Sequence, residues 1–182
     1  TSTGNGNIRY LSTAGDITLG LLDAGTGNVR VEAQSGDILD GRGATPATNV
    51  MSGNLQLVAS GNVGETFGAA VPGPLETDVD VVAVSAGGNL YLSEANALSL
   101  DNVATFDVTR VALNDALTAA SASGALIDAI AGNNLKIEST GGGITVAATA
   151  NNNGQATGGD LLLDAQAGDL VLNNPVTSGG NA

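Results

Sequence analysis

The stretch GNVRVEAQSGDI, residues 27–38, decides the fold because close variants of it occur elsewhere in the chain. GNIRYLSTAGDI occupies residues 6–17, and GDLLLDAQAGDL occupies residues 159–170. Each variant has a glycine with Asn or Asp, an apolar residue at every second position (Tyr10 in the first variant, aliphatic residues otherwise), a short polar link and the start of a second such half. Internal repetition of this kind predicts a repeat architecture in which each structural unit stacks on its neighbour.

The alternation inside each half predicts a short strand with one buried face. Val29 and Val31 lie on one side of such a strand, and Arg30 and Glu32 lie on the other. Glycine with Asn or Asp before each strand provides the backbone conformations that tight corners require. Strands this short need neighbours, so we expect each repeat to lie on the preceding one.

We therefore predict an all-β fold: a right-handed parallel β-helix, or β-solenoid, of roughly seven coils about 4.8 Å apart. The prediction treats residues 1–182 as a single solenoid segment with two inserted loops, at 64–78 and 112–131. The first loop is acidic, and the second is Ala-rich and compatible with a short helix. Because the chain starts without Met and already within the repeat, we expect it to be an internal or processed piece of a longer chain.

The repeat also predicts a dry aliphatic spine. One residue from each coil should stack in a single buried column. The expected column consists of Ile8, Val29, Leu55, Leu90, Leu135 and Leu161.

Composition excludes several classes of function. The 182 residues contain 18 acidic and 5 basic side chains, a net charge of −13, which repels nucleic acid and anionic lipid. The chain has no Cys and no His, which excludes disulfides, thiolate metal sites and histidine chemistry. We predict no cofactor and no metal. We also predict no membrane insertion, since no apolar run approaches the roughly 20 residues of a membrane helix.

GNIRYLSTAGDITLG, GNVRVEAQSGDILDG and GGNLYLSEANALSL resemble the repeats of filamentous-haemagglutinin-like proteins, a family of giant bacterial surface adhesins. The similarity covers most of the chain apart from the inserted loops. It implies a long right-handed β-helical shaft that is secreted or held at the cell surface and serves adhesion, biofilm structure or cell contact. The secretion domain typical of the family is not recognisable in this sequence.

A column of outward residues is the main candidate for binding. In the predicted stack it contains Arg9, Arg30, Gln56, Tyr91, Lys136 and Leu162. One interpretation is a ligand-facing stripe for an acidic glycan, with Arg9, Arg30, Tyr91 and Lys136 as the binding residues. The alternative is a solvated face whose ion pairs, such as Arg30 with Glu32, contribute about 0–1 kcal/mol each.

Two further chemistries remain open from the sequence. Asp78 and Asp80 point to one side of a predicted strand, and paired carboxylates can act as acid and base in glycoside cleavage, with Arg110 as a basic neighbour after folding. Repeated Asp and Asn at corners can hold calcium, but Asx turns explain them more simply. Neither the tandem calcium nonapeptide nor an EF-hand loop occurs.

The sequence as a whole favours a non-catalytic, extracellular structural shaft. The expected partners are neighbouring copies or adjoining segments of the same protein, stacked end to end through open strand edges. Extracellular glycans are the alternative partner, and a polysaccharide-active enzyme is a weaker alternative.

Overall fold

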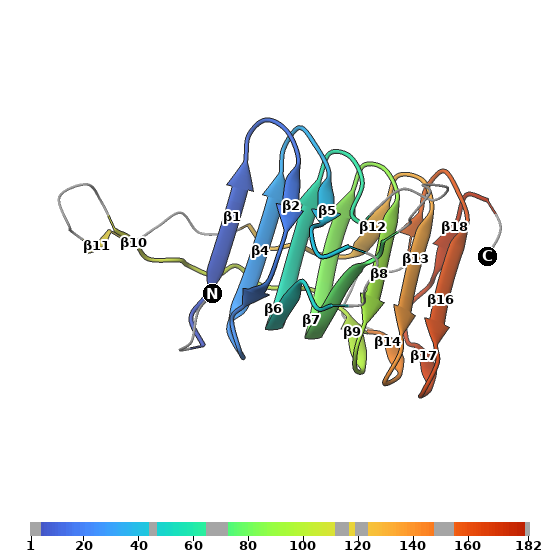
Figure 1. Cartoon of the computed structure of the whole chain (residues 1–182). Coiled ribbons are helices and arrows are strands. Elements are labelled where there is room, and N and C mark those ends of the chain that lie inside the picture. Colours follow the sequence, from blue (N-terminus) through green and yellow to red (C-terminus); the bar gives the residue numbers. More distant parts are fainter. Residues whose placement is uncertain are drawn as a thin grey trace.

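The computed structural model describes residues 5–43, 47–64, 73–111, 117–118, 124–147 and 155–180. These residues form an all-β fold without helices, dominated by a large sheet of mostly parallel strands (Figure 1). The expected fold class is therefore confirmed at this level. The strands are β1 (Ile8–Ser12), β2 (Ile17–Leu19), β3 (Leu22–Asp23), β4 (Asn28–Ala33), β5 (Ile38–Asp40), β6 (Val50–Ala59), β7 (Leu75–Ala86), β8 (Leu90–Glu94), β9 (Leu98–Leu100), β10 (Arg110–Val111), β11 (Leu117–Thr118), β12 (Ala129–Ala131), β13 (Leu135–Ser139), β14 (Ile144–Val146), β15 (Gln155–Ala156), β16 (Leu161–Ala165), β17 (Leu170–Leu172) and β18 (Thr177–Ser178).

Seven of these strands form a first row in the order β1-β4-β6-β7-β12-β15-β18. All of their pairings are parallel. Ile8 faces Val29, Val29 faces Leu55, and Leu55 faces Val82, so one aliphatic residue of each strand lies above the next. Figure 1 shows the rows of strands side by side, with the marked N and C ends at opposite ends of the array.

A second row contains β2, β5, β8, β13 and β16. Strands β2 and β5 pair in parallel, Val63 bridges Ile38 to Leu90, and β8, β13 and β16 continue the row. A third row is built by β9, β14 and β17, and β9 pairs with the middle of β7. The alternating pattern thus folds into strands whose inward aliphatic residues face one interior.

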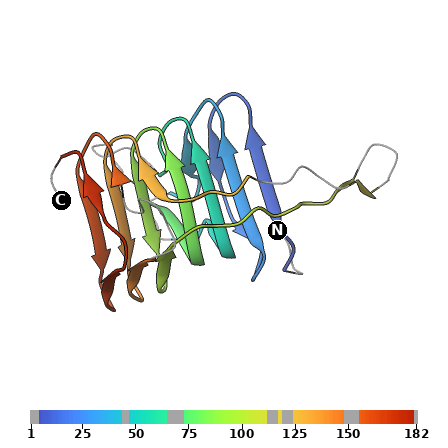
Figure 2. The ribbon, with the colours of Figure 1, turned by 180° about the vertical axis from the view of Figure 1, so that it is seen from behind.

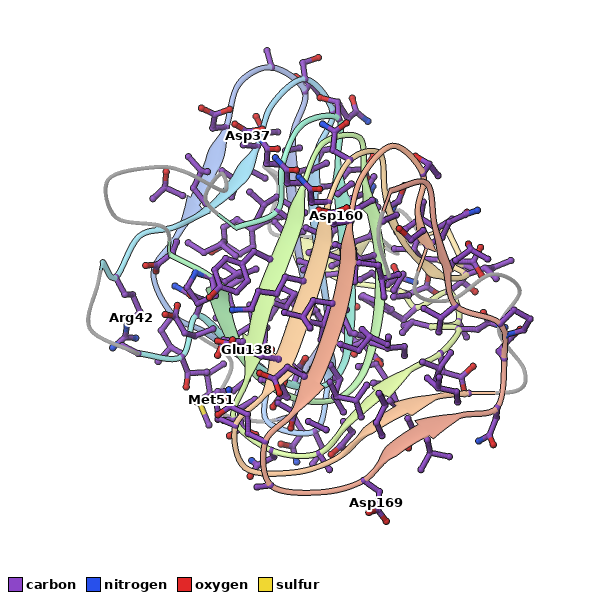
Figure 3. All side chains as sticks on the ribbon, turned by 90° about the vertical axis from the view of Figure 1, so that its right-hand side faces the viewer. Asp37, Arg42, Met51, Glu138, Asp160 and Asp169 are labelled. Carbon is purple, nitrogen blue, oxygen red and sulfur yellow. The ribbon has the colours of Figure 1, made fainter. Side chains whose placement is uncertain are left out.

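Asn and Asp side chains connect the corners between the first and second rows. The Asp16 carboxylate accepts a 2.9 Å hydrogen bond from the Asp37 backbone N–H, and the Asn62 side chain accepts one of 2.8 Å from Asn89. Asn134 and then Asp160 continue this corner ladder, with hydrogen bonds of 3.1 and 2.9 Å. Figure 3 shows Asp37 and Asp160 toward the same corner, with Asp169 at a different corner.

The predicted single aliphatic column is wrong. Ile8, Val29 and Leu55 stack in the first row, whereas Leu90, Leu135 and Leu161 stack in the second. The reason is a change of phase in the repeat. Strand β7 runs for 12 residues without a glycine–Asx corner, so Asn54 faces Val81 and Asn89 instead follows Asn62.

The interior is nevertheless aliphatic as expected. Val29, Leu55, Leu90 and Leu135 are each at most 1% exposed, although they belong to two rows. Close approach of neighbouring corners also requires glycine. A Cβ on Gly87 would overlap the backbone oxygen of Ser60, in the corner of the neighbouring repeat.

The inserted segments differ from their predicted bounds. Residues 65–72 of the acidic loop lie outside the described residues, and its last part belongs to β7, which begins at Leu75. The second insertion begins earlier than expected, after β9, and ends before β12. Its residues 112–116 and 119–123 lie outside the described part, and its described residues contain no helix. Within the described residues 101–111, only Arg110–Val111 form a strand, β10.

Candidate functional site

The four candidate binding residues belong to two different rows. Arg9 faces Arg30, and Arg30 faces Gln56, all in the first row. Tyr91 faces Lys136 in the second row. The change of phase in β7 therefore separates the predicted outward column into two pairs, and the single stripe of the sequence prediction is wrong.

The outer side of the first row is covered by the second insertion. We call its described limbs, residues 101–109 and 124–128, the strap. The Gln56 side-chain amide donates hydrogen bonds of 2.8 Å to the Val103 carbonyl and 3.1 Å to the Gly124 carbonyl. The Asn7 side chain donates one of 2.9 Å to the Asp107 carbonyl. Figure 2 shows both limbs of the strap running along the sheet toward β1.

This covering buries polar residues for which the sequence left two interpretations open, a ligand-facing stripe and a solvated face. Gln56 is fully buried and Arg30 is only 9% exposed. The Arg30 guanidinium donates to the side-chain amide oxygen of Gln56 at 2.8 Å and pairs with the Glu32 carboxylate at 3.1 Å. Burial raises the pKa of Glu32, but hydrogen bonds from Gln34 and Arg30 outweigh it and hold that pKa below its usual value. Arg30 thus supports the strap and is not a free ligand-binding cation.

The second row carries a compact polar cluster around Lys136. Its ammonium group lies 2.7 Å from the Glu138 carboxylate, donates to the Tyr91 hydroxyl at 3.0 Å and sits 4.4 Å from the centre of the Tyr91 ring. Burial lowers the pKa of Lys136, yet the hydrogen bonds to Glu138 and Tyr91 raise it above the ordinary value on balance. The cation is therefore already neutralised within the protein.

A pocket of about 480 Å³ lies beside this cluster. Strand β8 supplies Tyr91 and Ser93, β13 and the residue after it supply Glu138 and Thr140, and β7 supplies residues 76–77. The remaining lining residues are Gly43, Ala47, Thr48, Gly73, Pro74 and Ala95. Figure 3 shows Glu138 near the middle of the view, Arg42 at its left edge and Asp169 at the bottom.

Glu76 is the least compensated polar group of this pocket. Its Oε2 atom is buried and has no hydrogen-bond partner among the residues that the structure describes. Burial raises the pKa of Glu76 to about 7, and the negative charges of Asp40 and Glu138 add to the effect while Arg42 opposes it. A carboxyl group in this state is partly protonated near neutral pH, and it can bind through an acceptor or a donor.

A second buried carboxylate stands behind the pocket. Glu94 is fully buried, and its oxygens accept hydrogen bonds of 2.7 Å from the Thr77 hydroxyl and 3.0 Å from the Asn96 backbone N–H. The Val79 N–H donates to it as well, at 3.2 Å. Burial raises the pKa of Glu94 to about 6 against the effect of these hydrogen bonds. Glu94 joins β7 to β8 and thereby positions Thr77 at the pocket.

The predicted carboxylate pair for glycoside cleavage does not gain support from its surroundings. Asp78 accepts a 2.9 Å hydrogen bond from the Asn96 side chain, and Asp80 is exposed. The side chain of Arg110 lies outside the described residues. Within the described part of the chain, no three His, Cys, Asp or Glu residues cluster to hold a metal ion. The same part contains no helix long and apolar enough to cross a bilayer.

Sequence reasoning missed Glu76, Glu94 and the strap. Glu76 was assigned to a loop, although it alternates with Leu75 and Thr77, which are both buried. The Thr-Asp-Val-Asp-Val alternation that follows it, residues 77–81, was the available signal for a longer strand. Comparison of the chain with protein-family models, with curated proteins and with solved structures finds no match. The resemblance to filamentous-haemagglutinin-like repeats therefore stays a prediction.

Proposed function

We propose that this chain is a structural shaft: a right-handed β-solenoid segment of about seven coils whose role is mechanical rather than catalytic. The observation that carries the proposal is the in-register parallel stacking of seven strands in the first row. Each coil is tied to its neighbours by backbone hydrogen bonds, by the aliphatic interior and by the corner ladder of Asn and Asp side chains. At about 4.8 Å per strand, the row extends about 30 Å along its axis.

The partner surfaces in this proposal are the two ends of the array. Within the described residues, β1 pairs only with β4, and β16, β17 and β18 each pair with one neighbour only. Unpaired strand edges accept another strand. Strands β16 and β17, at the C-terminal end of the array, also expose Leu162, Leu170 and Leu172, and each of these side chains is at least 44% exposed. We infer that neighbouring copies or adjoining segments of the same protein cover these edges, in a heterologous contact that builds a linear array.

The two short strands beyond the strap, β10 and β11, favour the same arrangement. Figures 1 and 2 both show β10 and β11 beyond β1, past the end of the first row. These two strands pair with each other in an antiparallel hairpin. A unit placed next to β1 would therefore meet this hairpin as well as the strand edge.

We place this shaft outside the cell or on its surface, as the resemblance to adhesin repeats implies. The acidic composition, with a net charge of −13, is compatible with an extended soluble surface that repels nucleic acid and anionic lipid. An outward Arg/Tyr/Lys glycan face is not supported as an alternative, because its arginine pair lies under or beside the strap and its Tyr91–Lys136 pair lies in another row.

Electron microscopy of the purified chain over a range of concentrations tests end-to-end stacking. We expect linear arrays whose units repeat about every 30 Å. Leu172→Asp, at an exposed edge position, should abolish the arrays and leave the circular dichroism spectrum unchanged. Isolated particles at every concentration would contradict stacking between copies.

Force spectroscopy tests the shaft role separately. A chain pulled from its two ends should extend in several steps, because stacked coils release one after another. A coil of about 26 residues would release on the order of 90 Å of extended chain. Extension without resistance, or a single low-force event, would contradict a mechanical role.

A further inference from the structure

We propose that the pocket beside Tyr91 is a binding site for a neutral saccharide, with one sugar ring packed against Tyr91 and its hydroxyl groups donating to Glu76 and Glu138. This site is separate from the strand edges that the shaft proposal uses. Residues of the second row line the pocket together with residues from two other parts of the chain: Gly43, Ala47 and Thr48, and Gly73, Pro74, Glu76 and Thr77.

The size and mixed lining of the pocket fit a small organic ligand. Its volume of about 480 Å³ lies within the range of about 300–1,000 Å³ in which such ligands bind. Tyr91 supplies an aromatic surface, and Gly43, Ala47 and Pro74 supply further apolar surface. Such surfaces suit the C–H faces of a sugar ring, while polar groups among them orient its hydroxyls.

The polar groups of the pocket require a ligand that donates hydrogen bonds. Within the described part of the chain, the Glu76 Oε2 atom has no hydrogen-bond partner, and the Glu138 carboxylate lies 2.7 Å from the Lys136 ammonium. The hydroxyl of Thr140 already donates to the Glu94 carbonyl at 3.0 Å, so its lone pairs face outward as acceptors. A polyhydroxylated ligand supplies several donors within one ring.

Charge excludes an anionic ligand. None of the described residues that line the pocket is a Lys or an Arg. The nearby cations are engaged elsewhere: Lys136 pairs with Glu138, and Arg42 donates to the Thr48 carbonyl at 3.3 Å. Lys136 also occupies the cation position at the Tyr91 ring, which argues against a cationic ligand in the same place.

Nuclear magnetic resonance titration of the isotopically labelled chain tests the proposal. The probes are cellohexaose, maltohexaose and chitohexaose as neutral saccharides, a polygalacturonate oligomer as an anion and spermidine as a cation. We expect at least one neutral probe at about 10 mM to shift the backbone amides of Tyr91, Ser93 and Thr140, since this concentration saturates a Kd of about 1 mM. The other two classes should leave these amides unchanged.

Two substitutions connect the shifts to the pocket. Glu76→Leu removes the unpartnered carboxyl with little change of volume, so it should weaken binding roughly 10-fold or more while the protein stays folded. Tyr91→Leu should weaken binding similarly through loss of the ring. Leu162→Ala is the matched control, because it lies in the same outward column but outside this pocket, and it should bind like the unaltered chain.

Each outcome decides the proposal. Shifts caused only by the anion or by spermidine overturn the ligand class, and full binding by Glu76→Leu overturns the role of this pocket. No shift near Tyr91 with any neutral probe overturns the site itself. All of these results leave the shaft proposal intact, because linear arrays and stepwise extension are measured without a saccharide.

Discussion

The buried carboxyl of Glu94 makes the stability of the fold depend on pH in an unusual direction. Most carboxylates in proteins lose stabilising contacts when acid protonates them, but Glu94 is fully buried and burial raises its pKa from 4.5 to about 6. The protonated form is therefore favoured by folding. This contribution to stability is fully present below about pH 4.5 and is lost as the pH rises through about 6.

The expected magnitude follows from the shift. A difference of about 1.5 units between the unfolded and folded pKa corresponds to about 2 kcal/mol of unfolding free energy between about pH 4 and about pH 8. Glu94→Gln copies the protonated carboxyl. Its carbonyl oxygen can accept from the Asn96 N–H, and its amide can donate to the Thr77 hydroxyl. We expect the variant to be about 2 kcal/mol more stable than the unaltered chain at about pH 8 and about equally stable at about pH 4.

Urea denaturation followed by circular dichroism at several pH values measures this effect. The informative quantity is the difference between the two proteins, because groups such as Glu32, whose pKa is lowered, titrate equally in both. Glu76→Gln serves as a comparison: the contribution it removes should be lost as the pH rises from about 4.5 through about 7, and solvent screening should reduce it because Glu76 is partly exposed. A difference between Glu94→Gln and the unaltered chain that does not change with pH would refute the reasoning.

Four further substitutions test the packing of the rows. Val31→Asp places a charge at a fully buried position and should lower the free energy of unfolding, measured by urea denaturation, by about 3–5 kcal/mol. Leu162→Asp is the control: its side chain is 50% exposed, so the loss should be less than about 0.5 kcal/mol. Equal losses in the two variants would contradict the burial of Val31. Asn89→Ala removes one member of the corner ladder and should lower the free energy of unfolding by about 1–3 kcal/mol, and an unchanged melting curve would contradict a structural role for the ladder. Gln56→Ala removes the side-chain amide that donates to both limbs of the strap. Amide hydrogen exchange in the strap should therefore become faster than in the unaltered chain, with a smaller change in the row beneath it. Unchanged exchange would mean that other contacts hold the strap.

The candidate site could be predicted only in part. The sequence indicated that Tyr91 and Lys136 point outward in the same position of successive repeats, and the structure pairs them directly. It could not indicate that Arg30 lies beneath the strap. Gly124, the strap residue whose carbonyl accepts from Arg30, follows it by 94 residues in the chain. Alternation reports which side of a strand is polar, but a polar side chain can be covered when another segment supplies backbone carbonyls to it.

The sequence by itself determined the local structure: aliphatic residues at every second position, glycine–Asx corners and strands too short to be stable alone predict parallel, in-register stacking. Only the tertiary structure decided which repeat lies on which. A long strand such as β7 contains no glycine–Asx corner, so counting corners along the chain assigns Asn89 to the wrong row. The hydrogen bond from Asn89 to Asn62 sets the true register, because backbone and Asx groups at a buried corner must find partners in the adjacent coil.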